Sequence, residues 1–442
     1  MNVKVCKFGG TSMATAQSIR KVIRIIHKDP LRRIIVVSAP GKRFKEDIKV
    51  TDLLYTLADE LIRENNASTF ELVRERFLAI AKELRVLTPM KLILQETLEQ
   101  MQKIKTQEFI VSRGEYLSAQ LLSKVLKFEF VDAGTLIRFK VNSVNYKQTD
   151  TVARRALKFK TDVVIPGFYG TTAAGELKLL SRGGSDVTGA LIASAVNAKV
   201  YENWTDVDGF LVCDPKIVTD PALIEVMTYK ELRVLSFMGA SILHSDTFFP
   251  VARKGIPIHI QNTFNTRSPG TIIYQTIPSS KRGMAVTGIS GIKDYDLIVI
   301  EKELLSETVG IDRKILSFPE KMGVKVAHLP SGTDTFSMLI ESKYLPEDKL
   351  NQLIAQIRKG IKPNLIEVSK NIALISVVGR HLMTDNLNML RLFSALIKDN
   401  ITIKTIDYGS SGVNIVIGVN GEDYNYAIQA IYTEFYLKED DE

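Results

Sequence analysis

Two short glycine-rich segments, each carrying a basic residue, have the residue types that bind anions. The first, residues 7–12, reads KFGGTS, and the second, residues 182–186, reads RGGSD. Glycine lets a backbone approach a ligand closely, while lysine and arginine neutralise phosphate or carboxylate groups. Two such turns indicate two anionic ligands held face to face, as phosphoryl transfer requires. Each turn alone is also compatible with a simple connection between a strand and a helix.

Each segment is expected to join a strand to a helix. Lys7 ends a short apolar strand that begins at Val3, and Thr11 or Ser12 is the expected N-cap of the helix that follows. The free N–H groups and the dipole at a helix start favour phosphate. The helix itself is predicted by apolar residues at steps of three and four, namely Met13, Ala16, Ile19, Val22, Ile23 and Ile26.

Strands and helices alternate through residues 1 to about 275. Short β-branched runs predict strands, and longer runs with helical periodicity predict the helices between them. This order predicts an α/β fold with a mostly parallel central sheet that helices cover on both faces. The expected strands are 34–37, 128–131, 163–165 and 200–203, with 177–180 as a hairpin arm. One helix is expected to begin near 51, and the others are expected over about 68–85, 89–105, 111–127 and 187–198.

Polar residues gather where these strands end or where helices begin. Ligands of α/β sheets bind outside the carboxyl ends of the strands, so the convergence predicts one active site. Glu115 could instead be a solvated residue on a helix face, and Asp206 could form an Asx turn rather than meet Mg²⁺, a ribose or a lysine. The candidates are Ser38, Thr51, Glu115, Ser185, Asp186, Thr205 and Asp206.

The C-terminal third contains an internal repeat, which follows a linker-like segment at 276–284. At an offset of 77 residues, 297–300 matches 374–377 and 336–340 matches 413–417 without a gap. Each unit reads strand, helix, strand, turn, strand, helix. The pattern predicts a small α+β module that is present twice and that packs through its sheet edges.

Composition narrows the classes of function. The 442 residues carry a net charge of +8, but the basic residues are scattered, so we expect no nucleic acid partner. Apolar runs fall short of the roughly 18 residues of a membrane span, and the N-terminus lacks the pattern of a signal peptide. Two cysteines are too few for a disulfide framework, which predicts a cytoplasmic protein. The five histidines lack the spacing of metal ligands, so we expect no protein-bound metal cluster.

Several separated motifs make the chain resemble the aspartate kinases of the amino-acid kinase superfamily. The doubled C-terminal module is similar to their tandem ACT domains, and residues 38–51 most resemble the monofunctional, lysine-sensitive type. The resemblance implies a three-layer amino-acid kinase domain over 1–284 and two ferredoxin-like ACT domains over 285–370 and 371–442, between which strands could be exchanged. The motifs are KFGGTS (7–12), VSAP (37–40), SRGE (112–115), PGF (166–168), RGGSD (182–186) and WTDV (204–207).

The resemblance implies that ATP, with Mg²⁺, phosphorylates the side-chain carboxylate of L-aspartate to 4-phospho-L-aspartate. This is the first step of lysine, threonine and methionine biosynthesis in the family. Lys7 would neutralise the transferring phosphoryl group, and Asp186 would orient Lys7. The aspartate pocket would comprise Thr51, Glu115, Phe168, Arg182 and Ser185. The nucleotide would be held by Lys7, Gly9, Gly10, Ser38, Thr205, Asp206 and Lys216.

The resemblance also implies allosteric feedback through the ACT domains. Lysine is the expected effector, with threonine as a second candidate, and the ACT domains would form a homodimer or a dimer of dimers. Ala327 stands where the family often has an acid that meets lysine. The expected effector residues are Leu305, Thr308, Gly310, Ile311, Asp312, Ser331, Gly332, Thr333 and Asp334.

Three residues near the expected nucleotide site depart from the family pattern. Leu211, Lys216 and Ser241 stand where tyrosine, arginine and lysine are common, so we expect a modest affinity for ATP. Two other functions stay open. A kinase for glutamate or N-acetylglutamate is disfavoured by Thr51, Glu115 and the ACT pair, and an inactive amino-acid sensor is disfavoured by the complete KFGGTS and RGGSD motifs.

Overall fold

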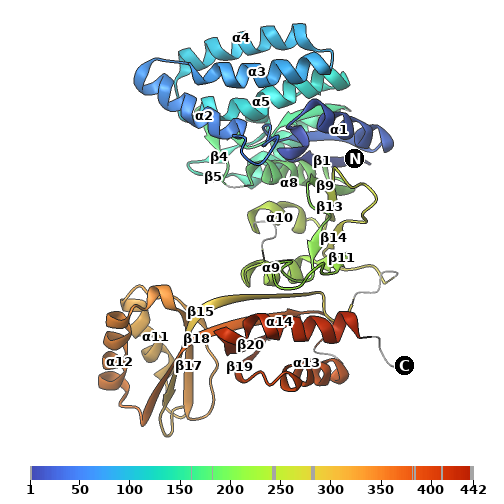
Figure 1. The fold of residues 1–442 in the computed structure, drawn as a ribbon. Helices are drawn as coiled ribbons and strands as arrows, with labels where there is room; N and C mark the ends of the chain where they lie inside the picture. Colours follow the sequence, from blue (N-terminus) through green and yellow to red (C-terminus); the bar gives the residue numbers. More distant parts are fainter. Residues whose placement is uncertain are drawn as a thin grey trace. The chain divides into compact units, whose positions relative to one another are not determined.

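The computed structural model describes residues 2–160, 162–181, 183–240, 245–279, 284–380, 382, 385–409 and 412–438. The chain divides into two compact units (Figure 1). The first comprises residues 1–210, 223–229 and 242–281, and the second comprises 211–222, 230–241 and 282–442. Two segments that precede the expected linker therefore belong to the C-terminal unit.

The first unit is built on an eight-stranded sheet in the order β12-β14-β13-β9-β1-β2-β6-β3. β1 (Lys4–Phe8) lies in the middle, and β9 (Val200–Thr205) and β2 (Arg32–Val37) run parallel to it on either side. The predicted, mostly parallel sheet is confirmed. The other strands are β3 (Glu129–Phe130), β6 (Val163–Pro166), β12 (Val226–Thr228), β13 (Ile258–Asn262) and β14 (Thr271–Tyr274).

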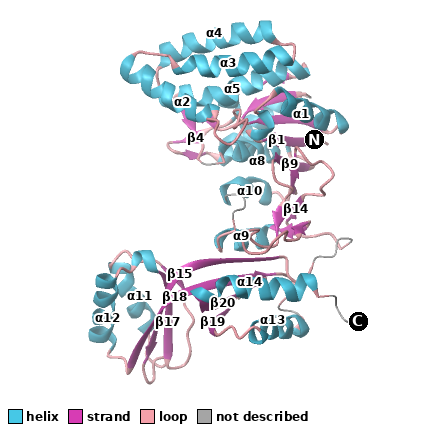
Figure 2. Cartoon of the chain, in the orientation of Figure 1, coloured by secondary structure: helices cyan, strands magenta, loops and turns pink. Residues whose placement is uncertain are grey.

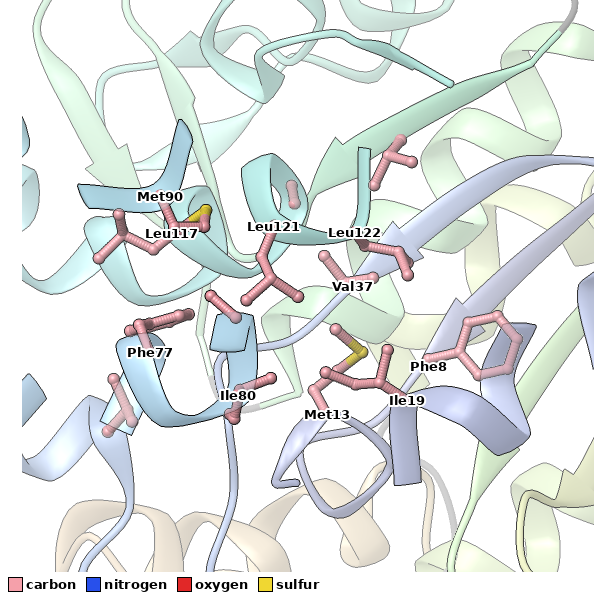
Figure 3. Close-up of a cluster of buried hydrophobic side chains, with 14 of the residues drawn as sticks. Phe8, Met13, Ile19, Val37, Phe77, Ile80, Met90, Leu117, Leu121 and Leu122 are labelled. Atoms are coloured by element: carbon pink, nitrogen blue, oxygen red, sulfur yellow. The ribbon is translucent and has the colours of Figure 1, made fainter. Parts of the chain in front are cut away.

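Helices cover both faces of this sheet (Figure 2). Successive side chains of a strand point to opposite faces, so Cys6 and Phe8 join the apolar core beneath α1 to α5, whereas Lys7 points towards α8. Figure 3 shows part of that core, including Phe8, Met13 and Leu121. The helices are α1 (Ala16–Lys28), α2 (Val50–Asp59), α3 (Thr69–Glu83), α4 (Leu87–Ile104), α5 (Gln107–Leu126), α6 (Ala133–Leu136), α7 (Tyr146–Leu157), α8 (Gly184–Val196), α9 (Tyr229–Phe237) and α10 (Ser245–Ala252).

Three two-stranded sheets accompany this large sheet. They are β4 (Phe139–Lys140) with β5 (Ser143–Val144), β7 (Tyr169–Thr171) with β8 (Leu177–Leu179), and β10 (Phe210–Leu211) with β11 (Leu223–Ile224). The β7–β8 pair confirms the hairpin expected near 177–180. In the described part of the chain, no helix combines the length and the apolar character that crossing a membrane would need.

The first helix begins later than its sequence predicts. Residues 11–13 form a 3₁₀ turn, and α1 begins at Ala16, with Thr15 as its N-cap. The Thr15 side chain accepts an N–H from the first turn of α1 at 3.1 Å. The prediction that Thr11 or Ser12 is the N-cap is therefore wrong, because Ser12 is buried and its hydroxyl bonds to a threonine after β13.

The second unit contains a six-stranded sheet in the order β16-β17-β15-β18-β20-β19. Its long central strands, β15 (Gly288–Glu301) and β18 (Leu365–Val378), are antiparallel and begin 77 residues apart, which confirms the repeat. The start of β15 pairs with the end of β18, so each long strand serves both modules. The other elements are α11 (Ile311–Lys321), β16 (Val326–His328), β17 (Thr335–Glu341), α12 (Glu347–Ile361), α13 (Asn386–Lys398), β19 (Ile403–Tyr408), β20 (Asn414–Asn420) and α14 (Tyr424–Tyr432).

Candidate active site

The candidate site forms where the middle strands of the first unit end. Gly9 N–H donates to the Trp204 carbonyl at 3.0 Å, and Ser38 N–H donates to the Phe8 carbonyl at 3.1 Å. These bonds extend the ladder one residue beyond β1 and β2. The segments that follow β1, β2, β6 and β9 therefore begin side by side at one edge of the sheet, as the sequence predicts.

A buried ion pair joins the central strand to α8. Lys7 Nζ lies 2.6 Å from Asp186 Oδ1, and the Lys7 side chain is only 9% exposed. Asn203, the partner of Lys7 in the β1–β9 register, donates from Nδ2 to the same Asp186 oxygen at 3.0 Å. The Lys7 ammonium is therefore held at a defined point beside the strand ends.

Sequence reasoning missed Asn203. Its Oδ1 is buried and has no hydrogen-bond partner among the described residues. The position of Asn203 in β9, one residue before Trp204, could have indicated its role. This position places Asn203 on the same face of the sheet as Lys7 once the register of the two strands is known. That register depends on pairing between distant segments, so the sequence alone did not show it.

The loops that follow β1 and β2 touch each other through glycines. Gly41 N–H donates to the Gly10 carbonyl at 2.8 Å. A Cβ atom at Gly41 would lie 2.8 Å from the Gly10 carbonyl carbon, so a side chain there would push the loops apart. Gly41 is a second residue that sequence reasoning did not single out, although the Pro40-Gly41 dipeptide marks a turn.

Helix α5 brings a buried carboxylate to the site. A Cβ atom at Gly114 would lie 2.8 Å from the Ala39 Cβ, so this glycine lets α5 pack against the loop after β2. Glu115 is only 5% exposed, and its Oε2 has no hydrogen-bond partner in the described part of the chain. The solvated alternative for Glu115 is wrong, and a carboxylate in this setting suits a cationic ligand group.

Burial raises the pKa of Glu115 to about 7, although backbone N–H groups, chiefly that of Ala39, and the charges of Arg113 and Lys7 oppose the rise. The carboxyl group is thus poised between its neutral and ionised forms near neutral pH. A cation that binds beside it would favour the ionised form.

The loop after β6 lies against the start of α8. A Cβ atom at Gly167 would lie 2.5 Å from Ser185 Oγ. Phe168 has a φ of 79°, a backbone conformation that residues other than glycine rarely adopt, and its N–H donates to Thr188 Oγ1 at 3.0 Å. The predicted pocket residues Phe168 and Ser185 are therefore brought together, while the predicted Arg182 lies outside the described residues.

Thr51 lies in the first turn of α2 and is half-buried. The helix begins at Val50, with Lys49 as its N-cap, so Thr51 lies inside the helix and does not cap it. Because the Thr51 hydroxyl does not cap the helix, it can form a hydrogen bond with a ligand instead.

The loops after β1 and β9 are also joined, through Asp206. Thr11 Oγ1 donates to Asp206 Oδ2 at 2.9 Å, and Thr205 Oγ1 donates to Asp206 Oδ1 at 3.2 Å. Lys216, which sequence reasoning grouped with Thr205 and Asp206, is exposed and belongs to the second unit. Among the described residues, no group of three or more His, Cys, Asp or Glu side chains is placed to hold a metal ion.

The two segments expected to contact an effector meet in the second unit. Ser306 N–H donates to the Thr333 carbonyl at 3.1 Å, and Lys302 N–H donates to the Asp334 carbonyl at 2.9 Å. The structure thus brings 302–312 and 331–334 together. Within these segments Leu305 and Ile311 are buried in the core of the first module, whereas Thr308, Asp312, Ser331, Gly332, Thr333 and Asp334 are exposed.

Comparisons with known proteins agree with this architecture. A model of the amino acid kinase family matches residues 2–262, and an ACT domain model matches residues 375–435. Aspartokinase 3 of Bacillus subtilis is 32% identical over 453 residues, which cover 98% of this chain and 99% of that protein.

Solved structures show the same likeness. The crystal structure of Clostridium acetobutylicum aspartate kinase is 39% identical, with a TM-score of 0.85, over 98% of this chain and 100% of the other. Two structures of E. coli aspartokinase III share the fold at 22% identity and a TM-score of 0.71, over 98% of this chain and 99–100% of theirs. One is a complex with aspartate and ADP, and the other is a complex with lysine and aspartate.

The raised pKa of Glu115 predicts a pH-dependent stability. The ordinary value is 4.5 and the folded value is about 7, so the folded state holds this proton more tightly. Its contribution is complete below pH 4.5 and is lost as the pH rises through 7. Relative to Glu115→Gln, we expect the free energy of unfolding of the wild type to fall by up to about 3 kcal/mol between roughly pH 5 and 8.

Urea titrations at several pH values measure this difference. Glu96→Gln, at an exposed position of α4, is the matched control and should follow the wild type. Parallel pH profiles for the wild type and Glu115→Gln would contradict the assignment.

Proposed function

The chain belongs to the amino acid kinase family and is an aspartate kinase with an ACT regulatory domain, and we propose that it transfers the γ-phosphoryl group of ATP to the side-chain carboxylate of L-aspartate. The products would be 4-phospho-L-aspartate and ADP, in the first step of lysine, threonine and methionine biosynthesis. The observation that carries the proposal is the ion pair between the buried Lys7 and Asp186. It stands at the same sheet edge as Glu115, whose Oε2 has no hydrogen-bond partner among the described residues.

Lys7 would stabilise the phosphoryl group during transfer. Phosphoryl transfer depends mainly on positioning and charge neutralisation, and the Lys7 ammonium is already positioned by Asp186 at 2.6 Å. Gly9, Gly10 and Ser38 would cradle the phosphates through backbone or hydroxyl donors. Since α1 begins at Ala16, the loop after β1 rather than the N-terminus of α1 would provide this cradle.

Mg²⁺ would reach the site bound mainly to the ATP phosphates, which is its usual mode in such enzymes. Asp186 and Asp206 are carboxylates near the strand ends, where such an ion could gain a further oxygen ligand. Asp206, exposed after β9 and fixed by two hydroxyl groups, is the side chain best suited to join its ligands. The ion would supply further neutralisation of the phosphate charge.

The aspartate pocket would be formed by Thr51, Glu115, Phe168, Arg182 and Ser185. Glu115 Oε2 lacks a hydrogen-bond partner among the described residues. The α-ammonium group of aspartate would provide one and would hold Glu115 in its ionised form. The accepting carboxylate is ionised at neutral pH, so it can attack without a general base. N-acetylglutamate has no ammonium group and would leave Glu115 unpaired, which favours a free amino acid.

A hydroxylamine trap tests the substrate directly, because it converts acyl phosphates to hydroxamates. With ATP and Mg²⁺, we expect hydroxamate formation from L-aspartate and at least a hundredfold less from L-glutamate or N-acetylglutamate. This ratio corresponds to the roughly 3 kcal/mol that a mispaired buried group costs. Signal from glutamate alone, or no signal with any acid, would overturn the proposal in favour of another acid kinase or an inactive sensor.

Feedback would act through the second unit. We propose that L-lysine, with L-threonine as a second candidate, binds near the exposed residues of 305–312 and 331–334, in a homodimer or dimer of dimers formed by ACT domains. Support comes from the hydrogen bonds that bring these two segments together and from the lysine complex of the E. coli relative. The functional domains would be 1–284, 285–370 and 371–442, with β15 and β18 shared by the two ACT domains.

The segment 211–222, which carries Lys216, is attached to α14 of the second ACT module. Gln429 Nε2 donates to the Ile217 carbonyl at 2.7 Å, and Ala222 N–H donates to Tyr432 Oη at 2.9 Å. If Lys216 binds ATP as proposed, α14 helps to position that contact. An effector that shifts the ACT modules would therefore act on the affinity for ATP.

Steady-state kinetics with and without millimolar L-lysine test this coupling. We expect lysine to raise the KM for ATP several-fold while leaving the KM for aspartate nearly unchanged. Tyr432→Phe removes one hydrogen bond, worth about 1 kcal/mol, and should raise the KM for ATP about fivefold without lysine. Tyr426→Phe, exposed on the same helix, is the matched control. A KM for ATP that neither lysine nor Tyr432→Phe alters would contradict the account.

A further inference from the structure

A cavity of about 580 Å³ opens beside α1 in the first unit, within the range of small-molecule sites. It is formed by one side of α1, the start of β2, the end of β9 and the loop after β13. None of the residues proposed for catalysis or for aspartate binding lines it. Its lining is Lys21, Arg24, Ile25, Lys28, Asp29, Pro30, Arg32, Trp204, Gln261, Thr263, Phe264 and Thr266.

The cavity carries uncompensated positive charge. Two of the charged residues that line the cavity already have ion-pair partners outside it. Asp29 pairs with Lys4 at 2.8 Å, and Arg32 pairs with Glu202 at 2.8 Å. Lys21, Arg24 and Lys28 form no ion pair with a described residue, and their spacing of three and four places them on one side of α1. Three cations that converge on a concave surface favour an anion with more than one charged oxygen.

Two further groups point to the rest of the ligand. Gln261 Oε1 is buried and has no hydrogen-bond partner among the described residues, so the amide of this side chain can pair with a polar group in the cavity. Phe264 presents a ring that is 37% exposed, with Lys21 Nζ 4.9 Å from its centroid. An aromatic face beside a cation is a stacking surface for a planar ring.

We propose that this cavity binds a phosphorylated heteroaromatic compound of the size of a nucleoside monophosphate. The phosphate would contact Lys21, Arg24 and Lys28, and the ring would stack on Phe264 and exchange a hydrogen bond with Gln261. Inorganic phosphate would leave the ring and the amide unused, and an apolar ligand would leave the cations unused. An acidic peptide would satisfy the cations alone.

The only tryptophan of the chain, Trp204, lines this cavity, so its fluorescence reports occupancy. The indole is buried, with the Arg32 guanidinium 5.1 Å from the ring centroid, and ligand contact with that guanidinium would change the emission. Uridine 5′-monophosphate is the probe. We expect a saturable change in the full-length protein, with weaker binding of inorganic phosphate and of uridine.

Arg24→Ala should weaken the binding of uridine monophosphate about tenfold, because it removes a charge-assisted contact. Arg20→Ala is the matched control, since Arg20 lies on the same helix outside the cavity and pairs with Glu83. Lys7→Met should retain the signal, which separates this cavity from the proposed catalytic site. Aspartate hydroxamate formation should be unchanged in Arg24→Ala, so failure here and failure of the proposed function are distinguishable.

Each other outcome would overturn the proposal. No saturable change, or equal affinity in Arg24→Ala and wild type, would exclude the nucleotide from this cavity. Uridine that binds as tightly as its monophosphate would exclude the role of the cations, and inorganic phosphate that binds as tightly would exclude the role of the ring. If hexaglutamate displaced uridine monophosphate at a concentration lower than that of the uridine monophosphate, the surface would be assigned to acidic peptides instead.

Discussion

The ion pair between Lys7 and Asp186 is the interaction on which the candidate site depends. Lys7 belongs to the central strand β1, and its side chain is only 9% exposed. Burying its charge would destabilise the fold unless a carboxylate compensated it. Helix α8 supplies that carboxylate, and it can approach because Gly189 leaves room for Tyr201, whose ring would lie 2.6 Å from a Cβ atom. The small residues of α8 therefore have a direct physical role. They bring the start of the helix to the strand ends, where Ser185 and Asp186 face the loops after β1 and β6.

A fully buried carboxylate, Glu202, lies on the opposite face of the sheet and binds side chains from the same strands. Glu202 of β9 is bonded to Lys4 of β1, to Arg32 of β2 and to Trp204 Nε1. Burial raises its pKa, but Arg32 and Lys4 outweigh that effect and hold the pKa of Glu202 below its ordinary value. It fixes the three strands in register, and this register places Lys7 beside Asn203.

Much of the fold and part of the site could be predicted from local pattern. The parallel sheet, the hairpin near 177–180 and the 77-residue repeat follow from periodicity and self-similarity, which report on local structure and burial. Lys7, Glu115 and Asp186 were found because charged residues next to glycine or at strand ends are few.

The rest could not be predicted, because it depends on contacts between distant segments. Ser12 has the residue type and position of an N-cap, but in the folded chain its hydroxyl forms a hydrogen bond with a residue 251 positions away. Asn203 and Gly41 gain their roles only when β9 and the loop after β2 meet β1. The attachment of 211–222 to α14 likewise joins residues about 210 positions apart. Lys216 folds with the second unit, whereas Thr205 and Asp206 fold with the first, and their positions in the sequence did not indicate this division.

The most direct test of the account is the turnover of Lys7→Met, which keeps the apolar stem of the side chain and removes its charge. The account predicts that kcat for aspartate hydroxamate formation falls by roughly 100- to 1,000-fold while the circular dichroism spectrum stays that of the wild type. Lys82→Met, at an exposed position of α3, should keep full activity. A folded Lys7→Met enzyme with near-normal kcat would contradict the central claim that charge neutralisation by Lys7 drives the reaction.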